Sequence, residues 1–108
     1  MGDLIGGISK NGIVYYKDTN KFELNGWFVP RKSYDSIEVY YNNEFLGSAE
    51  LDIERKDVVR NFLQFKDDKP GFRFLSDKIK YDNRDNIILL LIKHNGKIVD
   101  FRIENMQV

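Results

Sequence analysis

The most constraining feature of the sequence is the segment of residues 86–104, which has the pattern of one β-hairpin. Residues 86–94 are apolar at both odd and even positions, as in a central strand that is buried on two sides. Asn95-Gly96 then favours a tight hairpin turn, and residues 97–104 return as the partner strand. The segment therefore predicts an antiparallel pair that anchors a β-sheet core.

Alternation of apolar and polar residues with a period of two recurs through most of the chain, which indicates β-strands. Asn42-Asn43 fits a second tight turn, because asparagine tolerates the positive φ angles of such turns. Further strands are expected at residues 13–17, 21–29, 37–41 and 44–49, and around Phe72 and Phe74, with a short extension at residues 78–81.

One segment departs from this period. Val58, Val59 and Phe62 recur at helical spacing, so one or two helical turns are expected at residues 56–62. Seven or eight short strands with one brief helix indicate an all-β fold. The expected architecture is an antiparallel, immunoglobulin-like β-sandwich with a short helical crossover.

A length of 108 residues, of which 42% are hydrophobic, fits one domain with a single core. We expect residues 1–108 to form one β-sandwich domain, in which residues 1–12 are a flexible terminus. A chain of this kind can be one domain of a longer protein. It contains no Cys, so disulfide frameworks, thiolate catalysis and cysteine-bound zinc are excluded.

The 17 basic and 17 acidic residues cancel, so the chain has no overall positive field to attract nucleic acid. The longest apolar run, residues 87–92, is far shorter than the ~20 residues of a membrane span. Residues 1–6 lack the basic start of a signal peptide. We therefore expect no nucleic-acid partner, no membrane insertion and a cytoplasmic location. The oligomeric state stays open.

The sequence carries no signature of catalysis or of cofactor binding. His94 is the one histidine, and sequence spacing supplies neither a nucleophile nor an orienting partner for it. Nothing brings two carboxylates into the facing positions of a glycosidase pair. The acidic loop at residues 82–86 fails the calcium-loop pattern, because Arg84 occupies a ligand position. We therefore expect a domain that is not an enzyme and has no metal ligands and no cofactor.

Aromatic side chains are the remaining source of a function, since a flat ring can cover the apolar face of a sugar while its polar edge stays hydrated. Trp27, Tyr34 and Tyr40 are the candidates for carbohydrate binding. Trp27 also suits packing in the core, because its strand neighbours are apolar. Tyr34 falls in an expected loop, and Tyr40 is out of phase with the apolar positions of its strand. If these rings share a face, they form a platform of millimolar affinity.

Four short motifs carry a resemblance to a known family. They are Leu24-Asn25-Gly26-Trp27, the hairpin of residues 37–47, Arg55-Lys56-Asp57-Val58 and Pro70-Gly71-Phe72. Together they resemble a small immunoglobulin-like accessory domain found in bacterial glycosyltransferases and other proteins of surface-polysaccharide synthesis. The resemblance covers about residues 22–97 of the chain. Lys56 and Leu63 depart from it, because the family usually has proline at the first position and often at the second.

The resemblance implies a non-catalytic accessory module that is associated with glycosyltransferase machinery and binds bacterial surface glycans weakly. It implies structural roles for Gly26, Arg55, Asp57 and Gly71, with Arg55 and Asp57 fastening the helical crossover to the sandwich. The alternative is a structural spacer or protein-interaction domain that packs against a neighbouring catalytic domain. A row of aromatic rings on one face favours glycan binding, whereas an apolar patch or an open sheet edge favours the alternative.

Overall fold

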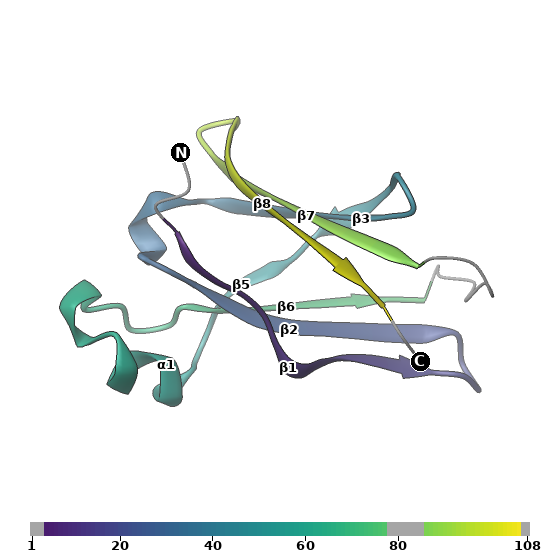
Figure 1. The fold of residues 1–108 in the computed structure, drawn as a ribbon, viewed down its shortest axis with the longest axis horizontal. Coiled ribbons are helices and arrows are strands. Elements are labelled where there is room, and N and C mark those ends of the chain that lie inside the picture. Colours follow the sequence, from purple (N-terminus) through teal and green to yellow (C-terminus); the bar gives the residue numbers. More distant parts are fainter. Residues whose placement is uncertain (1–3, 78–85, 107–108) are drawn as a thin grey trace.

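The computed structural model describes residues 4–77 and 86–106, and this part of the chain forms an antiparallel β-sandwich (Figure 1). Sheet A has the strand order β1-β2-β6-β5, and sheet B has the order β4-β3-β7-β8. The strands are β1 (Ile5–Tyr16), β2 (Lys21–Val29), β3 (Ser36–Tyr41), β4 (Glu44–Ser48), β5 (Glu50–Ile53), β6 (Gly71–Ser76), β7 (Ile87–His94) and β8 (Lys97–Asn105). The expected all-β sandwich is confirmed.

The core lies between the two sheets, because alternate residues of each strand point inward. Phe28 of β2 stacks on Phe72 of β6, with ring centroids 5.6 Å apart and planes 14° apart. The buried apolar cluster is Leu4, Phe22, Leu24, Phe28, Tyr34, Ile37, Val39, Tyr41, Phe72, Phe74, Ile88, Leu90, Ile92 and Met106. It joins residues from both sheets, so the described residues share one hydrophobic core.

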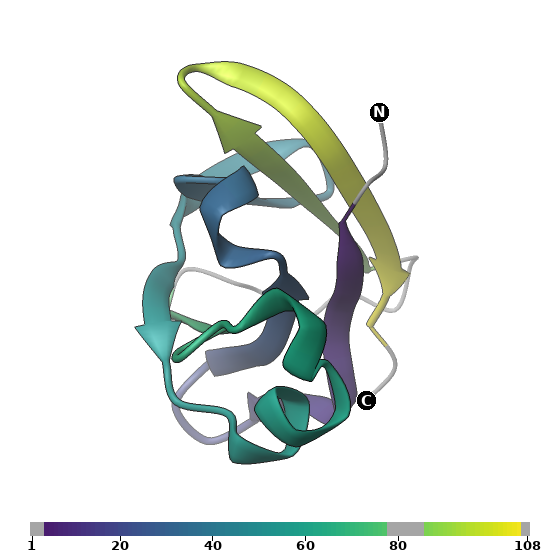
Figure 2. The same cartoon turned by 90° about the vertical axis from the view of Figure 1, so that its left-hand side faces the viewer.

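The predicted helical crossover is confirmed as α1 (Lys56–Asn61), which connects β5 to β6. A 3-10 turn, η2 (Leu63–Phe65), follows it, and a second one, η1 (Arg31–Ser33), lies between β2 and β3. Helix α1 and η2 lie at one end of the sandwich, beside sheet A (Figure 2).

The two predicted hairpin turns are confirmed by their backbone angles. Asn42 and Asn43 have φ values of 46° and 70°, and Asn95 and Gly96 have values of 52° and 80°. Positive φ at both central residues is what a tight two-residue hairpin turn requires. These turns connect β3 to β4 and β7 to β8, so both hairpins of sheet B follow from local sequence.

Strand β1 is longer than predicted, and the expectation of a flexible terminus is wrong for residues 4–12. The strand begins at Ile5, and Leu4 is buried in the core. Its first half pairs with β2 through Gly6 and Gly7, opposite Phe28 and Trp27. Because glycine contributes no side chain to an alternating pattern, the strand is hidden in the sequence.

Strand β5 was not predicted, because it has four residues and an irregular register in which Asp52 has a φ of 61°. The expected extension at residues 78–81 and all but Asn86 of the acidic loop at residues 82–86 lie outside the described residues.

Strand β7 is central in sheet B, as predicted, between β3 and β8. The expectation that it is buried on two sides is wrong. Ile88, Leu90 and Ile92 are buried against sheet A, whereas Leu89 and Leu91 lie on the other face and are only half-buried by their neighbours. An apolar strand therefore turns one of its faces to the surface of the molecule.

Candidate functional site

Trp27 lies on the outer side of sheet A and is half-buried. Its partners in the flanking strands are Gly7 and Gly71, so its large ring has no side chain beside it in either strand. Phe62, which directly follows α1, covers the ring at a centroid distance of 5.2 Å and an angle of 42°. Trp27 thus anchors the crossover to sheet A, which is a packing role.

Tyr34 lies in the loop between η1 and β3, as predicted, but its side chain is buried in the core. Its hydroxyl donates to the backbone oxygen of Phe28 at 2.9 Å and lies 3.3 Å from that of Pro70. Burial, opposed by the charge of Arg31, raises the pKa of Tyr34 well above its ordinary value. A ring in this position presents no face to a sugar.

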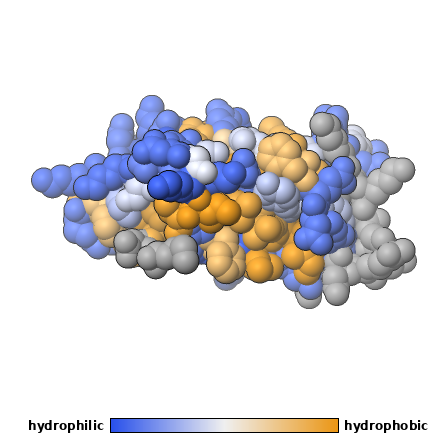
Figure 3. Space-filling model, turned by 90° about the horizontal axis from the view of Figure 1, so that it is seen from above, coloured by the Kyte–Doolittle hydropathy of each residue, from blue (hydrophilic) through white to orange (hydrophobic). Residues whose placement is uncertain are grey.

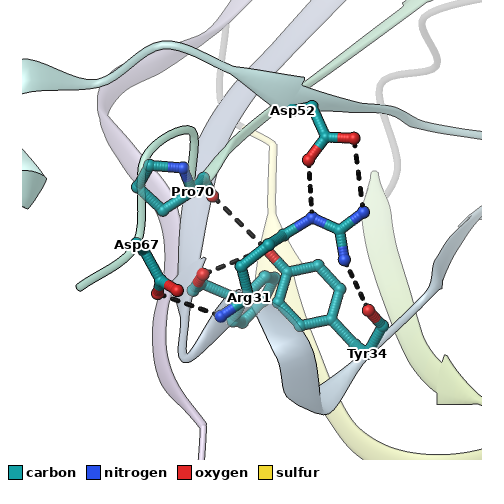
Figure 4. Close-up of polar contacts among 6 residues, drawn as sticks. Arg31, Tyr34, Asp52, Asp67 and Pro70 are labelled. Carbon is teal, nitrogen blue, oxygen red and sulfur yellow. Dashed lines mark hydrogen bonds and ion pairs between the residues drawn. The ribbon is translucent and has the colours of Figure 1, made fainter. Parts of the chain in front are cut away.

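Arg31 is the centre of the polar cluster drawn in Figure 4. Its guanidinium binds both carboxylate oxygens of Asp52, at 2.9 and 3.5 Å, and donates to the backbone oxygen of Tyr34 at 2.6 Å. Its backbone N–H donates to Asp67 at 2.9 Å. Asp52 and Asp67 are therefore both bound to Arg31. Asp52 joins η1 to β5, and Asp67 joins η1 to the loop before β6.

Tyr40 lies on the outer side of sheet B and is half-buried. Its hydroxyl donates to Glu38 at 3.2 Å, and the same carboxylate oxygen accepts from Lys93 at 2.9 Å. Desolvation, followed by the nearby charge of Glu38, raises the pKa of Tyr40. Its ring contacts Phe45 at a centroid distance of 5.3 Å, with the planes 56° apart.

The three predicted carbohydrate-binding residues are therefore separated by the fold. Trp27 lies on the outer side of sheet A, Tyr34 lies in the core, and Tyr40 lies on the outer side of sheet B. They form no common platform. Of the three, Tyr40 alone lies beside another ring, Phe45, that is exposed to solvent.

Tyr40 belongs to a larger apolar surface that we call the outer B face. It consists of three cross-strand rows, which are Phe45, Tyr40, Leu89 and Ile103; Ser48, Glu38, Leu91 and Phe101; and Ser36, Lys93 and Ile98. Residues that pair directly across an antiparallel sheet have side chains on the same side of it. The rows therefore place the aromatic and aliphatic side chains of four strands next to one another.

Four side chains of the outer B face are exposed by half or more. The exposed fractions are 53% for Phe45, 51% for Ile98, 55% for Phe101 and 60% for Ile103. Figure 3 views the molecule from the side of sheet B and shows a hydrophobic region across the middle of its surface. Single exposed apolar residues are normal, whereas a contiguous group on one face is typical of an interaction surface.

Sequence reasoning did not single out Phe45, Ile98, Phe101 or Ile103. The signal was present, because residues 86–94 are apolar at both odd and even positions. That pattern is typical of a strand with an apolar environment on both faces, whereas the described residues fully bury only one face of β7. The pattern therefore marked a surface rather than a doubly buried strand.

The motif residues of the crossover lie together at the start of α1. Arg55 binds both carboxylate oxygens of Asp57, at 3.0 and 2.8 Å, and donates to the hydroxyl of Ser9 in β1 at 2.7 Å. The hydrogen bonds from Arg55 to the Asp57 carboxylate lower the pKa of Asp57 to about 2. The contact with Ser9 joins the crossover to the edge strand of sheet A.

Gly26 and Gly71 each stand where a side chain would collide. A Cβ atom on Gly71 would lie 2.6 Å from the backbone oxygen of Ile53, and one on Gly26 would overlap the backbone oxygen of Gly7 and the ring of Phe72. Both glycines therefore permit close approach of neighbouring strands in sheet A.

The described residues contain no group of three or more His, Asp or Glu side chains that could hold a metal ion. Over the same residues, no helix has the length and apolar character needed to cross a membrane. Compared with known proteins, the chain matches no family, no curated protein and no solved structure.

Proposed function

We propose that this chain is a non-catalytic interaction module that packs its outer B face against the surface of another protein. The observation that carries this proposal is the contiguous apolar surface formed by the three cross-strand rows of sheet B. This function corresponds to the spacer or protein-interaction domain of the sequence analysis, which an apolar patch favours.

The energetics support a role in binding. Burying the exposed half of a phenylalanine side chain removes on the order of 100 Å² from water, which stabilises a complex by about 2 kcal/mol. Phe45, Phe101 and Ile103 each keep more than half of their surface in solvent in the folded chain. Their aromatic and aliphatic character is therefore better explained by a partner than by folding.

The mixture of side chains favours a protein partner over a sugar. Ile98, Ile103, Leu89 and Leu91 are aliphatic and have no flat face to stack on a sugar ring. Such residues fill the fully buried centre of protein interfaces. In the setting that the family resemblance implies, the module would serve as a spacer or assembly element beside a catalytic domain.

Glycan binding is the second candidate, and the contact between Phe45 and Tyr40 favours it. The exposed ring of Phe45 lies beside a tyrosine hydroxyl that is held by Glu38, so an apolar face and polar groups are adjacent. One or two stacked rings would add ~0.5–1.5 kcal/mol each, which gives weak binding. An NMR titration with bacterial surface oligosaccharides would then shift resonances of Phe45 and Tyr40 saturably.

Site-directed photo-cross-linking tests the main proposal. Phe101 is replaced by the photoreactive residue benzoylphenylalanine in the natural full-length protein, and cross-linking is carried out in the cells that make it. A discrete protein adduct is expected, identified by mass spectrometry and lost when Phe45 and Ile103 are changed to Ser and Thr.

The control places the same residue at Leu75, which is 61% exposed on the outer side of sheet A. It should give no discrete adduct. Equal cross-linking from positions 101 and 75, or none from position 101, would contradict the proposal.

A further inference from the structure

The proposed function leaves the partner open, and the paired charges and apolar side chains of the outer B face are compatible with a second copy of this chain. Resting on that function, we infer that the partner is a second copy of this chain, and that two copies pack their outer B faces together as a weak two-fold dimer. Two packed β-sheets, ≈10 Å apart, are a common arrangement of this kind of surface.

The charge of the face permits this self-association. Its two charged side chains, Glu38 and Lys93, are bound to each other at 2.9 Å, so the face carries no unpaired charge. The whole chain has 17 basic and 17 acidic residues, and its net charge is zero. Two copies therefore approach without like-charge repulsion, and proteins with no net charge tend to associate.

The sequence of β7 favours a second apolar layer. Sheet A covers Ile88, Leu90 and Ile92, and a second copy would cover Leu89 and Leu91 in the same manner. The strand would then be buried on two sides, as its continuous apolar pattern predicts.

A two-fold axis that runs parallel to the strands makes the two faces complementary. It places β4 of one copy across from β8 of the other, since these strands are the two edges of sheet B. Phe45 and Ile103 belong to the same cross-strand row, so the ring at one edge would meet the aliphatic side chain at the other. The axis also exchanges β3 with β7, so Glu38 of each copy would lie across from Leu91 of the other, one row away from the Lys93 of that copy.

The area of the face indicates a weak dimer. Four strands at ~4.8 Å spacing and six to eight residues at ~3.3 Å rise cover a flat area of roughly 400–500 Å² per copy. A standard interface buries about 800 Å² per partner, and smaller ones are weak or transient. We therefore expect dissociation constants on the order of 10–500 μM, a range in which assembly depends on concentration.

Sedimentation equilibrium between micromolar and millimolar protein measures this assembly. The natural chain should change from monomer to dimer, and Phe101→Ser should weaken the dimer about tenfold or more. Leu75→Ser is the matched control, because Leu75 is similarly exposed on the other sheet, and its replacement should leave the dimer unchanged. Since Phe101 is exposed, its variant should keep the far-ultraviolet circular dichroism spectrum of the natural chain, and Ile103→Thr provides a second test.

Cross-linking tests the arrangement of the two copies. The chain has no Cys, so Phe45→Cys and Ile103→Cys each introduce a single thiol. In an equal mixture of the two variants, a thiol linker that spans about 10 Å should join position 45 to position 103 more often than it joins two identical positions. Leu75→Cys should give no link above the background of random collisions.

The outcomes separate this inference from the proposed function. A monomer at all concentrations, or a dimer that Phe101→Ser does not weaken, would overturn the inference. In that case a foreign protein cross-linked to position 101 would still support the interaction module. If position 101 gives no adduct either, both proposals fail. A dimer in which identical positions link preferentially would overturn the two-fold arrangement stated here.

Discussion

The hydroxyl of Tyr34 donates a hydrogen bond to the backbone oxygen of Phe28 at 2.9 Å, across the turn that leads from β2 to β3. The side chain thereby holds the end of the strand that precedes it. The contact is comparable to the tyrosine corners of β-sandwich domains, in which a tyrosine hydroxyl binds the backbone a few residues upstream.

Tyr34→Phe should lower the free energy of unfolding by about 1–3 kcal/mol, because a buried backbone oxygen loses its donor. Urea denaturation measures the change. Tyr40→Phe is the control, since its hydroxyl bonds Glu38 in a partly buried position and should matter less. Equal losses for the two variants would contradict the role given to Tyr34.

Phe62→Ala should shift the fluorescence emission of the chain to longer wavelength. Trp27 is the one tryptophan, and Phe62 covers its ring at 5.2 Å, so removing Phe62 exposes the indole to water. Leu63→Ala serves as the control, because Leu63 is 67% exposed. An unchanged emission maximum in Phe62→Ala would mean that the ring of Phe62 does not cover Trp27.

Gly26→Ala should destabilise the fold by about 1–3 kcal/mol, because the added methyl group overlaps the backbone of β1 and the ring of Phe72. In a strand with free space the same change would be stabilising, since alanine restricts the unfolded chain more than glycine does. The change in the free energy of unfolding, measured by heat or urea, therefore has opposite signs for a crowded and an uncrowded position. A more stable Gly26→Ala variant would rule out the close approach of β1 to β2 at this point.

The pair of Arg55 and Asp57 should make stability depend on pH in the acid range. The pKa of Asp57 falls from 3.8 to about 2 on folding, mainly because Arg55 hydrogen-bonds the carboxylate. A depressed folded pKa contributes stability that is present above pH 3.8 and is lost as the pH falls toward 2. The contribution should be no more than about 1 kcal/mol, because more than half of the Asp57 side chain is exposed.

Unfolding of the natural chain and of Asp57→Asn between pH 2 and 7 checks this dependence. The difference in unfolding free energy should be largest near neutral pH, should shrink toward pH 2, and should also shrink in high salt. A difference that grows as the pH falls would have the wrong sign for a depressed carboxyl pKa.

Much of the fold could be predicted because it depends on local sequence. Asn42-Asn43 and Asn95-Gly96 adopt the positive φ angles of hairpin turns, and the alternation in residues 21–29 matches β2 residue for residue. The first half of β1 was hidden because Gly6 and Gly7 lack the side chains that create a periodic pattern. Its pairing depends on Gly26, which is distant in sequence.

The candidate site was harder to predict because it depends on tertiary contacts. Tyr34 is buried through bonds that include Pro70, which is 36 residues away, and no local pattern reports such a contact. Phe45 and Ile103 become neighbours of one surface only when β4, β3, β7 and β8 align. The apolar pattern of β7 indicated two covered faces, and sequence alone does not say that the chain itself buries only one of them.

The pairing of β3 with β7 also has a consequence for the rate at which this chain folds. The hairpins β1-β2, β3-β4 and β7-β8 close through short turns, but β3 and β7 meet only after the chain between Tyr41 and Ile87 has been brought back on itself. Closing so long a loop lowers the entropy of the chain before many contacts compensate for it, and domains rich in such contacts fold slowly. The step that limits folding is therefore expected to be the joining of preformed hairpins. Until β3 and β7 pair, the apolar residues of β7 are exposed to solvent and can aggregate.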